Sequence, residues 1–411
     1  MTSATSAELA GPDRRDARRR HWRRWLAVVL VMIVGLVAVG VVWFLDRATP
    51  AAPTAFYTPP DPLPSGPAGT IIRSEPITSG LPPGARAERI LYLSTGVHGE
   101  PVAVSGIVIS PADAGEAPRP IVAWAHGTVG VVPACGPSHA KDPFQFIPEL
   151  ALLVNQGFVV AATDYPGLGT PGVHPYLVGP VAAASVLDSV RAARSMDIDA
   201  GDGFVVWGHS QGGASALWTG QEAAAYAPEL RLLGVAAAAP ATDLAMILEA
   251  GHDTKAGAVL GAEALYSWSQ NYPDAGLATV VKPEQLEQVR RIAQVCITTP
   301  AAFLLAGDLA TPDQFLAVDP VTTEPWKTII SDNSTRGPIA APMLITHGTA
   351  DGVIPFAASE AEVARRCGQG EAVQFLRIPE GTHQGALDST DTVTVGWIED
   401  RFAGRPAPSS C

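Results

Sequence analysis

The sequence predicts an α/β fold in which a mostly parallel, doubly wound sheet carries an inserted helical cap. Short apolar runs typical of buried parallel strands alternate with longer segments whose apolar residues recur at helical spacing. Such alternation is typical of strand–helix–strand units with right-handed crossovers. About a hundred residues between two of the strand-like runs have helical periodicity and no clear strand, which predicts the cap.

The first 70 residues predict a membrane anchor and a spacer. Residues 1–24 are basic, and residues 25–45 contain no charged residue and are long enough to cross a bilayer as a helix. The positive-inside rule places the basic end in the cytoplasm. Because the apolar run is long for a signal peptide and no convincing cleavage site follows it, we expect a single-pass signal-anchor, with secretion after cleavage as the alternative. Residues 46–70 are rich in proline and predict an extended linker.

Charge and cysteine content narrow the possible partners and cofactors. The chain has a formal net charge of −13, and since residues 1–24 contribute +4, the remainder carries −17. An acidic exported domain is not expected to bind nucleic acid. The four cysteines would lie in an oxidising compartment, where disulfides form, and they include no Cys-x-x-Cys pair typical of metal sites. We therefore expect no metal, and the sequence indicates no protein partner.

The domain is expected over residues 71–411, and its elements follow in order along the chain. Strands are predicted at 89–93, 102–109, 121–125, 158–162, 204–207, 232–238, 343–346 and 373–378. Helices are predicted within 144–156, at 181–196, from 214 to about 226, within 356–366 and from about 392 to 402. The helical cap is expected at about 241–338.

The segment VVWGHSQGGASALW has the G-x-S-x-G pattern of a nucleophile elbow. Such an elbow is a sharp strand-to-helix turn whose flanking positions must be nearly free of side chain, and Gly208 and Gly212 meet this need. An apolar, strand-like run precedes the turn and an alanine-rich helical run follows it. Because the pattern alone is common in glycine-rich chains, it is this context that makes Ser210 the candidate nucleophile.

A serine nucleophile needs a base within hydrogen-bond reach and an acid that orients the base. In α/β enzymes with this elbow the acid and then the histidine follow the serine along the chain. Asp351 lies in a glycine-containing loop after an apolar run, and His383 is the only histidine beyond it. We therefore predict Asp351 as the acid and His383 as the base. Asp243 and Asp308 are alternative acids, but neither follows a matching strand, and helix capping or solvation explains them better.

Acyl transfer also needs two N–H donors aimed at the oxyanion. We expect the first from the backbone of Gln211, directly after the serine, whose side chain should matter less. The second is expected from Thr128 in the motif HGT, with Gly127 as a neighbouring candidate. His126 and His209 are interpreted as structural residues that hold these loops by hydrogen bonds.

These motifs together resemble the α/β-hydrolase superfamily and, more narrowly, the secretory lipase family of fungi and its actinobacterial relatives. HGT with the following CGPS, GHSQGG, HGTADGVIP and GTHQG carry the resemblance, and DYPGLGTPGVHPYLVG is its most specific part. The resemblance covers about residues 71–402. It implies hydrolysis of carboxylic esters, often acylglycerols, under a helical cap, and a disulfide between Cys135 and Cys296. A second disulfide between Cys367 and Cys411 stays open, and the anchor departs from the freely secreted members.

The leading hypothesis is a serine lipase or esterase whose catalytic domain lies outside the cytoplasm and whose substrate is a lipid or another ester. Ser210 would attack the ester carbonyl, His383 would transfer the proton and Asp351 would orient His383, without a cofactor. A peptidase or an acyltransferase could use the same triad, because a fold and a triad do not determine the acceptor. A non-catalytic lipid-binding protein on the same scaffold is a further alternative, but such a protein would be expected to have lost triad residues.

Overall fold

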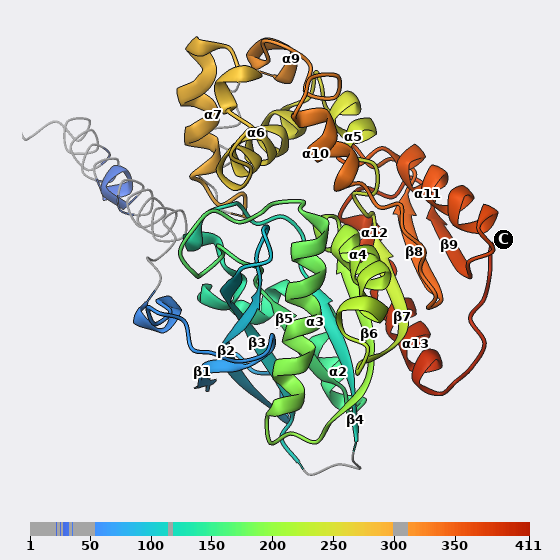
Figure 1. The fold of residues 1–411 in the computed structure, drawn as a ribbon. Helices are drawn as coiled ribbons and strands as arrows, with labels where there is room; N and C mark the ends of the chain where they lie inside the picture. Colours follow the sequence, from blue (N-terminus) through green and yellow to red (C-terminus); the bar gives the residue numbers. More distant parts are fainter. Residues whose placement is uncertain are drawn as a thin grey trace, which may run out of the picture. The chain divides into compact units, whose positions relative to one another are not determined.

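The computed structural model describes residues 54–113, 118–298 and 311–411, and a few helical residues between 22 and 35. The chain divides into residues 1–49 and 50–411, and the second unit is described here by itself. Within it, the described residues form a nine-stranded sheet in the order β1-β2-β3-β5-β4-β6-β7-β8-β9, shown in Figure 1. The predicted α/β class with a mostly parallel sheet is confirmed.

The sheet begins with antiparallel strands and continues with parallel ones. β1 to β3 pair antiparallel with their neighbours, β3 pairs antiparallel with β5, and every pairing from β5 through β4 to β9 is parallel. The strands are β1 Ile71–Ile77, β2 Ala85–Thr95, β3 Pro101–Pro111, β4 Arg119–Ala125, β5 Val159–Thr163, β6 Ala200–His209, β7 Arg231–Ala238, β8 Met343–Gly348 and β9 Val373–Ile378. The structure adds β1 to the strands that the sequence predicted.

Helices cover both faces of the sheet. On one face α3 and α4 pack with α11, and on the other α2 packs with α12 and α13. Neighbouring residues of β6 point to opposite faces of the sheet. Val206 belongs to the apolar cluster that includes residues of α3 and α4, and Val205 belongs to the cluster that includes residues of α2 and α13. The helices are α2 Leu150–Asn155, α3 Gly179–Ser195, α4 Gln211–Tyr226, α11 Phe356–Gly368, α12 Gly385–Asp388 and α13 Asp391–Phe402.

The helix expected within 144–156 is shorter than its apolar spacing suggests. A 3-10 helix, η4 (Pro143–Phe146), comes first, and α2 begins only at Leu150. Pro148 lies between them. Proline has no backbone N–H and disfavours the helical conformation of the residue before it, so the chain cannot form one continuous helix here.

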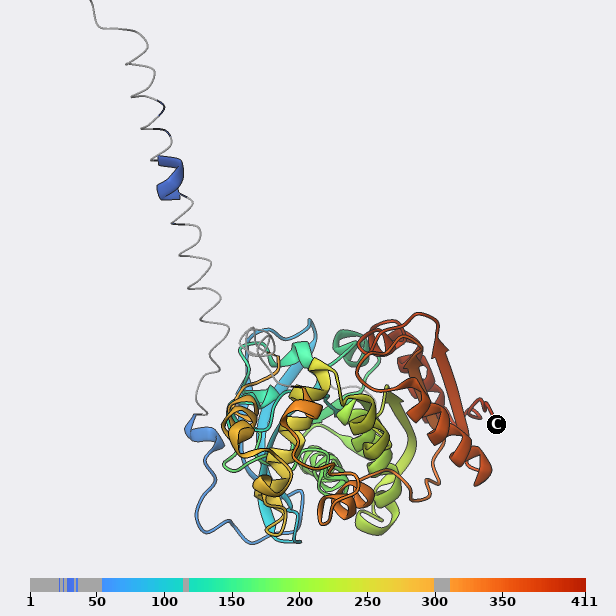
Figure 2. The same cartoon turned by 90° about the horizontal axis from the view of Figure 1, so that it is seen from above.

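A cap of helices is inserted between β7 and β8. Figure 1 shows these helices above the sheet, and in Figure 2, seen from above, they lie in front of it. Their apolar side chains, which include Leu265, Trp268 and Trp326, form one cluster with residues of the domain below, such as Tyr176 and Ala214. The helices are α5 Leu244–Ala250, α6 Lys255–Asn271, α7 Leu286–Ala293, α9 Pro312–Phe315 and α10 Trp326–Asp332.

Two disulfides join distant parts of the chain. Cys135, in the loop after β4, is bonded to Cys296, just beyond α7 of the cap, with Cα atoms 5.3 Å apart. Cys367 of α11 is bonded to Cys411 at the end of the chain. The pairing implied by the family resemblance is confirmed, and the second pairing, which the sequence left open, is formed. The first disulfide ties the cap to the loop after β4, which contains the candidate oxyanion donor Thr128.

The segment expected as a linker, residues 46–70, packs on the domain through residues in its C-terminal part. Phe56 and Tyr57, in the 3-10 helix η1 (Ala55–Tyr57), are buried. The Tyr57 hydroxyl is hydrogen-bonded to Ser138, 3.0 Å away, and Arg73 donates to the carbonyl oxygens of Ala55 and Phe56. Ala55–Tyr57 therefore form a strap that packs on the domain, and this part of residues 46–70 is not an extended spacer.

Most of the predicted membrane anchor at residues 25–45 lies outside the described residues. Within the described part of the chain, every helix is too short or too polar to cross a bilayer.

Candidate active site

Ser210 occupies a strained turn between β6 and α4. Its φ of 58° lies in the left-handed region, which is unusual for a residue with a side chain. A Cβ on Gly212 would lie 1.9 Å from the Ala125 carbonyl oxygen, and one on Gly208 would lie 2.1 Å from the Gly212 carbonyl oxygen. Both glycines are therefore required for the close packing of this turn, and the strand, turn and helix stand where the sequence predicted them.

Asp351 and His383 meet in the loops after β8 and β9. His383 Nδ1 donates to Asp351 Oδ2 at 2.7 Å, and Asp351 Oδ1 accepts from the backbone N–H groups of Val353 and Ile354 at 2.7 and 2.9 Å. Burial disfavours a charge on Asp351, but the hydrogen bonds from His347 and His383 outweigh it and hold the pKa of the carboxyl well below its ordinary value. Asp351 is thus an ionised partner for the imidazole.

Ser210 and His383 line the same cavity, together with Gly127 and Thr128. Among the described residues no hydrogen bond joins the Ser210 hydroxyl to His383. Such bonds are often long in free enzymes and tighten when substrate binds. The structure therefore brings the predicted nucleophile, base and acid to one place.

His209 holds the loop that contains His383. Its Nε2 is 3.1 Å from the His383 carbonyl oxygen, and the two rings lie 4.7 Å apart. Burial and the nearby His383 lower the pKa of His209 to about 4, so its ring is neutral at pH 7 and Nε2–H is the donor. These contacts agree with the structural role that the sequence suggested for His209.

The motif HGT lies beside the elbow. A Cβ on Gly127 would be 3.7 Å from the Ser210 Cβ, so the Gly127 backbone is adjacent to the nucleophile. The Thr128 hydroxyl is hydrogen-bonded to the Tyr176 hydroxyl at 2.9 Å, and His126 contacts the carbonyl oxygens of Gly127 and Asp164. Side chains on both sides thus hold this loop in place.

The Gln211 side chain has a structural partner that the sequence did not reveal. It is buried, and its Nε2 donates to His174 Nε2 at 2.7 Å. Burial lowers the pKa of His174 to about 3, and its Nδ1 lies 3.1 Å from the Pro166 carbonyl oxygen, so Nδ1–H donates and Nε2 accepts. His174 stands in the segment DYPGLGTPGVHPYLVG, the most specific part of the family resemblance. That resemblance is the only feature of the sequence that draws attention to His174.

Two substitutions at Gln211 should separate its backbone from its side chain. Gln211→Ala leaves His174 Nε2 unpaired and should cost about 1–3 kcal/mol of stability while most of kcat/KM is retained. Gln211→Pro removes the N–H and should lower kcat by about 10²-fold or more. Thermal unfolding and ester hydrolysis measure the two effects. Equal loss of kcat in both variants, with the fold retained, would show that the side chain itself takes part in the reaction.

Glu263 of α6 is a buried acid without a hydrogen-bond partner among the described residues. Burial raises the pKa of Glu263 well above its ordinary value, and a negative charge on Glu263 would raise the pKa of the nearby Tyr176. The folded protein therefore binds a proton that the unfolded chain releases above about pH 4.3, and the free energy of unfolding should fall as pH rises beyond that point.

Glu263→Gln should remove this dependence. We expect the variant to have a higher Tm than the wild type at pH 8, and the difference should shrink toward pH 4, where Glu263 is protonated in both states. Thermal unfolding across this pH range measures it. A difference in Tm between the two proteins that stays the same from pH 4 to pH 8 would contradict the expectation.

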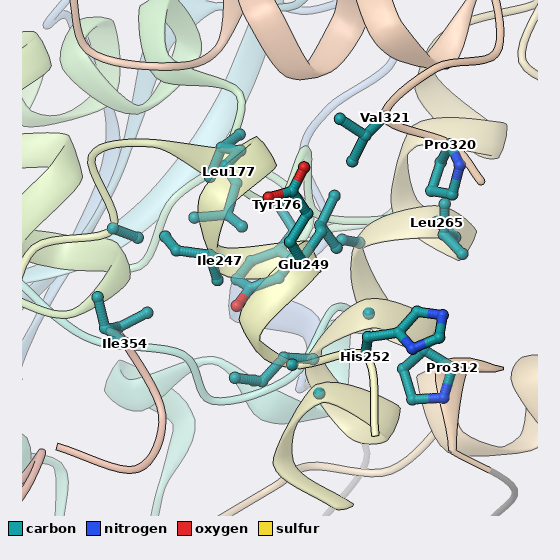
Figure 3. A pocket seen from close by; sticks show the side chains of 18 of the residues that line it. Tyr176, Leu177, Ile247, Glu249, His252, Leu265, Pro312, Pro320, Val321 and Ile354 are labelled. Carbon is teal, nitrogen blue, oxygen red and sulfur yellow. The ribbon is translucent and has the colours of Figure 1, made fainter. Parts of the chain in front are cut away.

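Ser210 also lines a second cavity, of about 300 Å³, beneath the cap. Figure 3 shows side chains that line it, including Leu177, Ile247, Leu265 and Val321. The cavity that contains His383 and Thr128 is larger, about 630 Å³, and its lining includes the polar residues Gln384, Asp388 and Asp391. The nucleophile thus stands where a largely apolar cavity and a more polar one meet.

The chain is similar to known proteins over most of its length. Residues 147–410 match the model of the secretory lipase family. A probable inactive lipase of Mycobacterium tuberculosis is 25% identical over 373 residues, covering 85% of this chain and 82% of that protein. A secreted triacylglycerol lipase of Malassezia globosa is 26% identical over 382 residues, covering 87% and 82%. The crystal structure of Candida antarctica lipase A superposes with a TM-score of 0.76 at 18% identity, covering 89% of each chain, which shows a common fold.

Proposed function

Because the chain belongs to the secretory lipase family and is a carboxylic-ester hydrolase of the α/β-hydrolase fold, we propose that Ser210, His383 and Asp351 are its catalytic triad. The observation that carries the proposal is the 2.7 Å hydrogen bond between His383 and Asp351. His383 lines the same cavity as Ser210. The positive φ of Ser210 at a strand-to-helix turn supports it further.

In the proposed mechanism, Ser210 Oγ attacks the ester carbonyl carbon as His383 Nε2 takes the hydroxyl proton. The carbonyl oxygen becomes an oxyanion, which the N–H groups of Gln211 and Thr128 stabilise. Collapse of the intermediate breaks the bond to the alcohol oxygen, which receives the proton from His383. Water then attacks the acyl-serine by the same proton transfers, releasing the carboxylic acid and restoring the Ser210 hydroxyl.

The two cavities suggest where each half of the ester binds. The leaving alcohol must lie near His383, which protonates it, and His383 lines only the larger of the two. The acyl chain would then lie in the largely apolar cavity under the cap. Since a cavity of about 150 Å³ holds one benzene ring, a cavity of about 300 Å³ suits an acyl chain of about 8–12 carbons. The secreted triacylglycerol lipase among the relatives makes acylglycerols the first natural esters to test.

A series of nitrophenyl esters of increasing acyl length tests this assignment. We expect kcat/KM to peak at about 8–12 carbons, given a cavity twice the size that holds benzene. Gly261, which lines the acyl cavity, is the position to change, since a Cβ there would meet only Phe315 Cζ, 4.0 Å away. Gly261→Ile should shift the optimum to shorter chains and leave butyryl ester hydrolysis intact. A length profile that Gly261→Ile does not change would place the acyl chain elsewhere, and no hydrolysis of any ester would refute the function.

For localisation, we propose export with residues 25–45 as a membrane anchor. The apolar, uncharged sequence of this segment supports the proposal, as does the exposure of Trp25 and residues 28–32 in the described part of it. The secreted relative supports export itself. Fractionation of cells that express the full chain tests the anchor. Hydrolytic activity should sediment with the membranes. A shortened, active protein in the medium would show that the segment is cleaved instead.

A further inference from the structure

His347, at the end of β8, has no role in the proposed mechanism but touches the proposed acid. Its side chain is completely buried, and its Nε2 lies 3.0 Å from Asp351 Oδ2. The same nitrogen is 3.2 Å from the Ile354 carbonyl oxygen. Both neighbours only accept hydrogen bonds when Asp351 is ionised, so Nε2 must carry a proton.

The other ring nitrogen of His347 completes the assignment. Nδ1 is 2.7 Å from the hydroxyl oxygen of Ser359 on α11. In the neutral ring with hydrogen on Nε2, Nδ1 is an acceptor, and the Ser359 hydroxyl donates to it. Phe356 packs edge-on against the ring at 5.5 Å. The contacts of Nε2 thus assign the proton to that nitrogen, and Ser359 and Phe356 hold the ring in its orientation.

The Asp351 carboxylate therefore has a donor at every side. Oδ1 accepts the N–H groups of Val353 and Ile354, and Oδ2 accepts the N–H of His383. Oδ2 also lies 3.0 Å from His347 Nε2, whose single N–H it shares with the Ile354 carbonyl oxygen. The two histidines donate to a single oxygen, so each hydrogen bond withdraws electron density from that oxygen and weakens the other one. Without His347, Oδ2 would accept from His383 alone, and the carboxylate would be less firmly oriented and more basic.

We propose that His347 is a positioning residue that orients the Asp351 carboxylate toward His383 and limits its basicity, with Ser359 holding the His347 ring. The inference rests on the proposed triad. The titratable group in direct contact with His347 is Asp351, and His383, which is bonded to the same carboxylate oxygen, and His209 lie beyond it.

The pH dependence of kcat/KM tests the role, because its acid limb reports protonation of His383 in the free enzyme. In His347→Phe the more basic carboxylate should hold the His383 imidazolium more strongly. We expect the acid limb to move upward by about half a pH unit or more and kcat to fall by about tenfold. The assay uses the full chain and a neutral nitrophenyl ester.

Two further variants separate this role from simple packing. His347→Gln places an amide N–H near the position of Nε2 and should return the acid limb to within about 0.2 pH units of the wild type. Ser359→Ala leaves the Nε2 donor in place but removes the support at Nδ1, so it should move the limb less than His347→Phe does. An unshifted limb in His347→Phe, or a shifted one in His347→Gln, would overturn the proposal.

A measurement on the wild-type protein covers the case in which His347→Phe does not fold. Nitrogen chemical shifts of His347 should show hydrogen on Nε2 and none on Nδ1, and the opposite tautomer would overturn the proposal. Failure of the triad itself is recognised separately, because Ser210→Ala would then retain hydrolysis whatever the behaviour of His347.

Discussion

Ser210→Ala is expected to lower kcat for ester hydrolysis by about 10⁴-fold or more without unfolding the protein. The substitution removes the only atom that forms the acyl-enzyme bond in the proposed mechanism. Alanine keeps the Cβ, so the turn at φ 58° and the close contacts of Gly208 and Gly212 are unchanged. The measurement is steady-state hydrolysis of a nitrophenyl ester, together with release of the first equivalent of nitrophenol, which reports acylation.

Ser215→Ala is the matched control for this prediction. Ser215 lies one turn further along α4 and is also buried, and its hydroxyl donates to the Gln211 carbonyl oxygen. Its loss should cost about 1 kcal/mol of stability and leave kcat within a few-fold of the wild type. If Ser210→Ala retained near-wild-type turnover, or if both variants lost it equally, Ser210 would not be the nucleophile. One relative is described as a probable inactive lipase, so activity of the wild type is measured first.

Asp351→Asn is expected to lower kcat by about 10⁴-fold. The asparagine cannot supply the negative charge that balances the His383 imidazolium. If its amide nitrogen takes the place of Oδ2, it also opposes the N–H groups of His383 and His347. The loss should appear in kcat at the pH optimum, and fluorescence and thermal unfolding should verify that the fold persists.

Asp243→Asn is the comparison for this second prediction, because the sequence allowed Asp243 as an alternative acid. In the structure Asp243 accepts a hydrogen bond from the Met246 N–H and caps α5. Asparagine caps a helix as well as aspartate does, so both stability and kcat should be nearly unchanged. A large loss of kcat in Asp243→Asn and none in Asp351→Asn would exchange the two assignments. Asp308, the other alternative, lies outside the described residues.

The local parts of the site could be predicted because each depends on a short stretch of chain. The elbow needs only a strand, two glycines and a helix around Ser210, and all three are visible as patterns within one segment. The order of Asp351 and His383 after the serine matches the chain order of α/β enzymes that have this elbow. The interruption near Pro148 was missed, since helical periodicity continues across a proline that the backbone does not tolerate.

The hydrogen-bond partners of the site could not be predicted, because they come from segments far apart in sequence. His174 is 37 positions from Gln211, and the strap residue Tyr57 is 81 positions from Ser138. His347 stands four residues before Asp351, yet its direction depends on Ser359 across the loop on α11. No periodicity or spacing reports which nitrogen of a histidine faces which oxygen.

By itself, the sequence determined the α/β class, the elbow at Ser210 and the candidates Asp351 and His383, since these follow from apolar periodicity and residue order. The tertiary structure alone decided the pairing of Cys367 with Cys411, the packing of the strap at Tyr57 and the four donors around Asp351. The reason is physical: a strand or a turn is selected by local backbone and burial preferences. A hydrogen bond or a disulfide exists only where the folded chain brings two distant groups within about 3 Å or, for sulfur atoms, bonding distance.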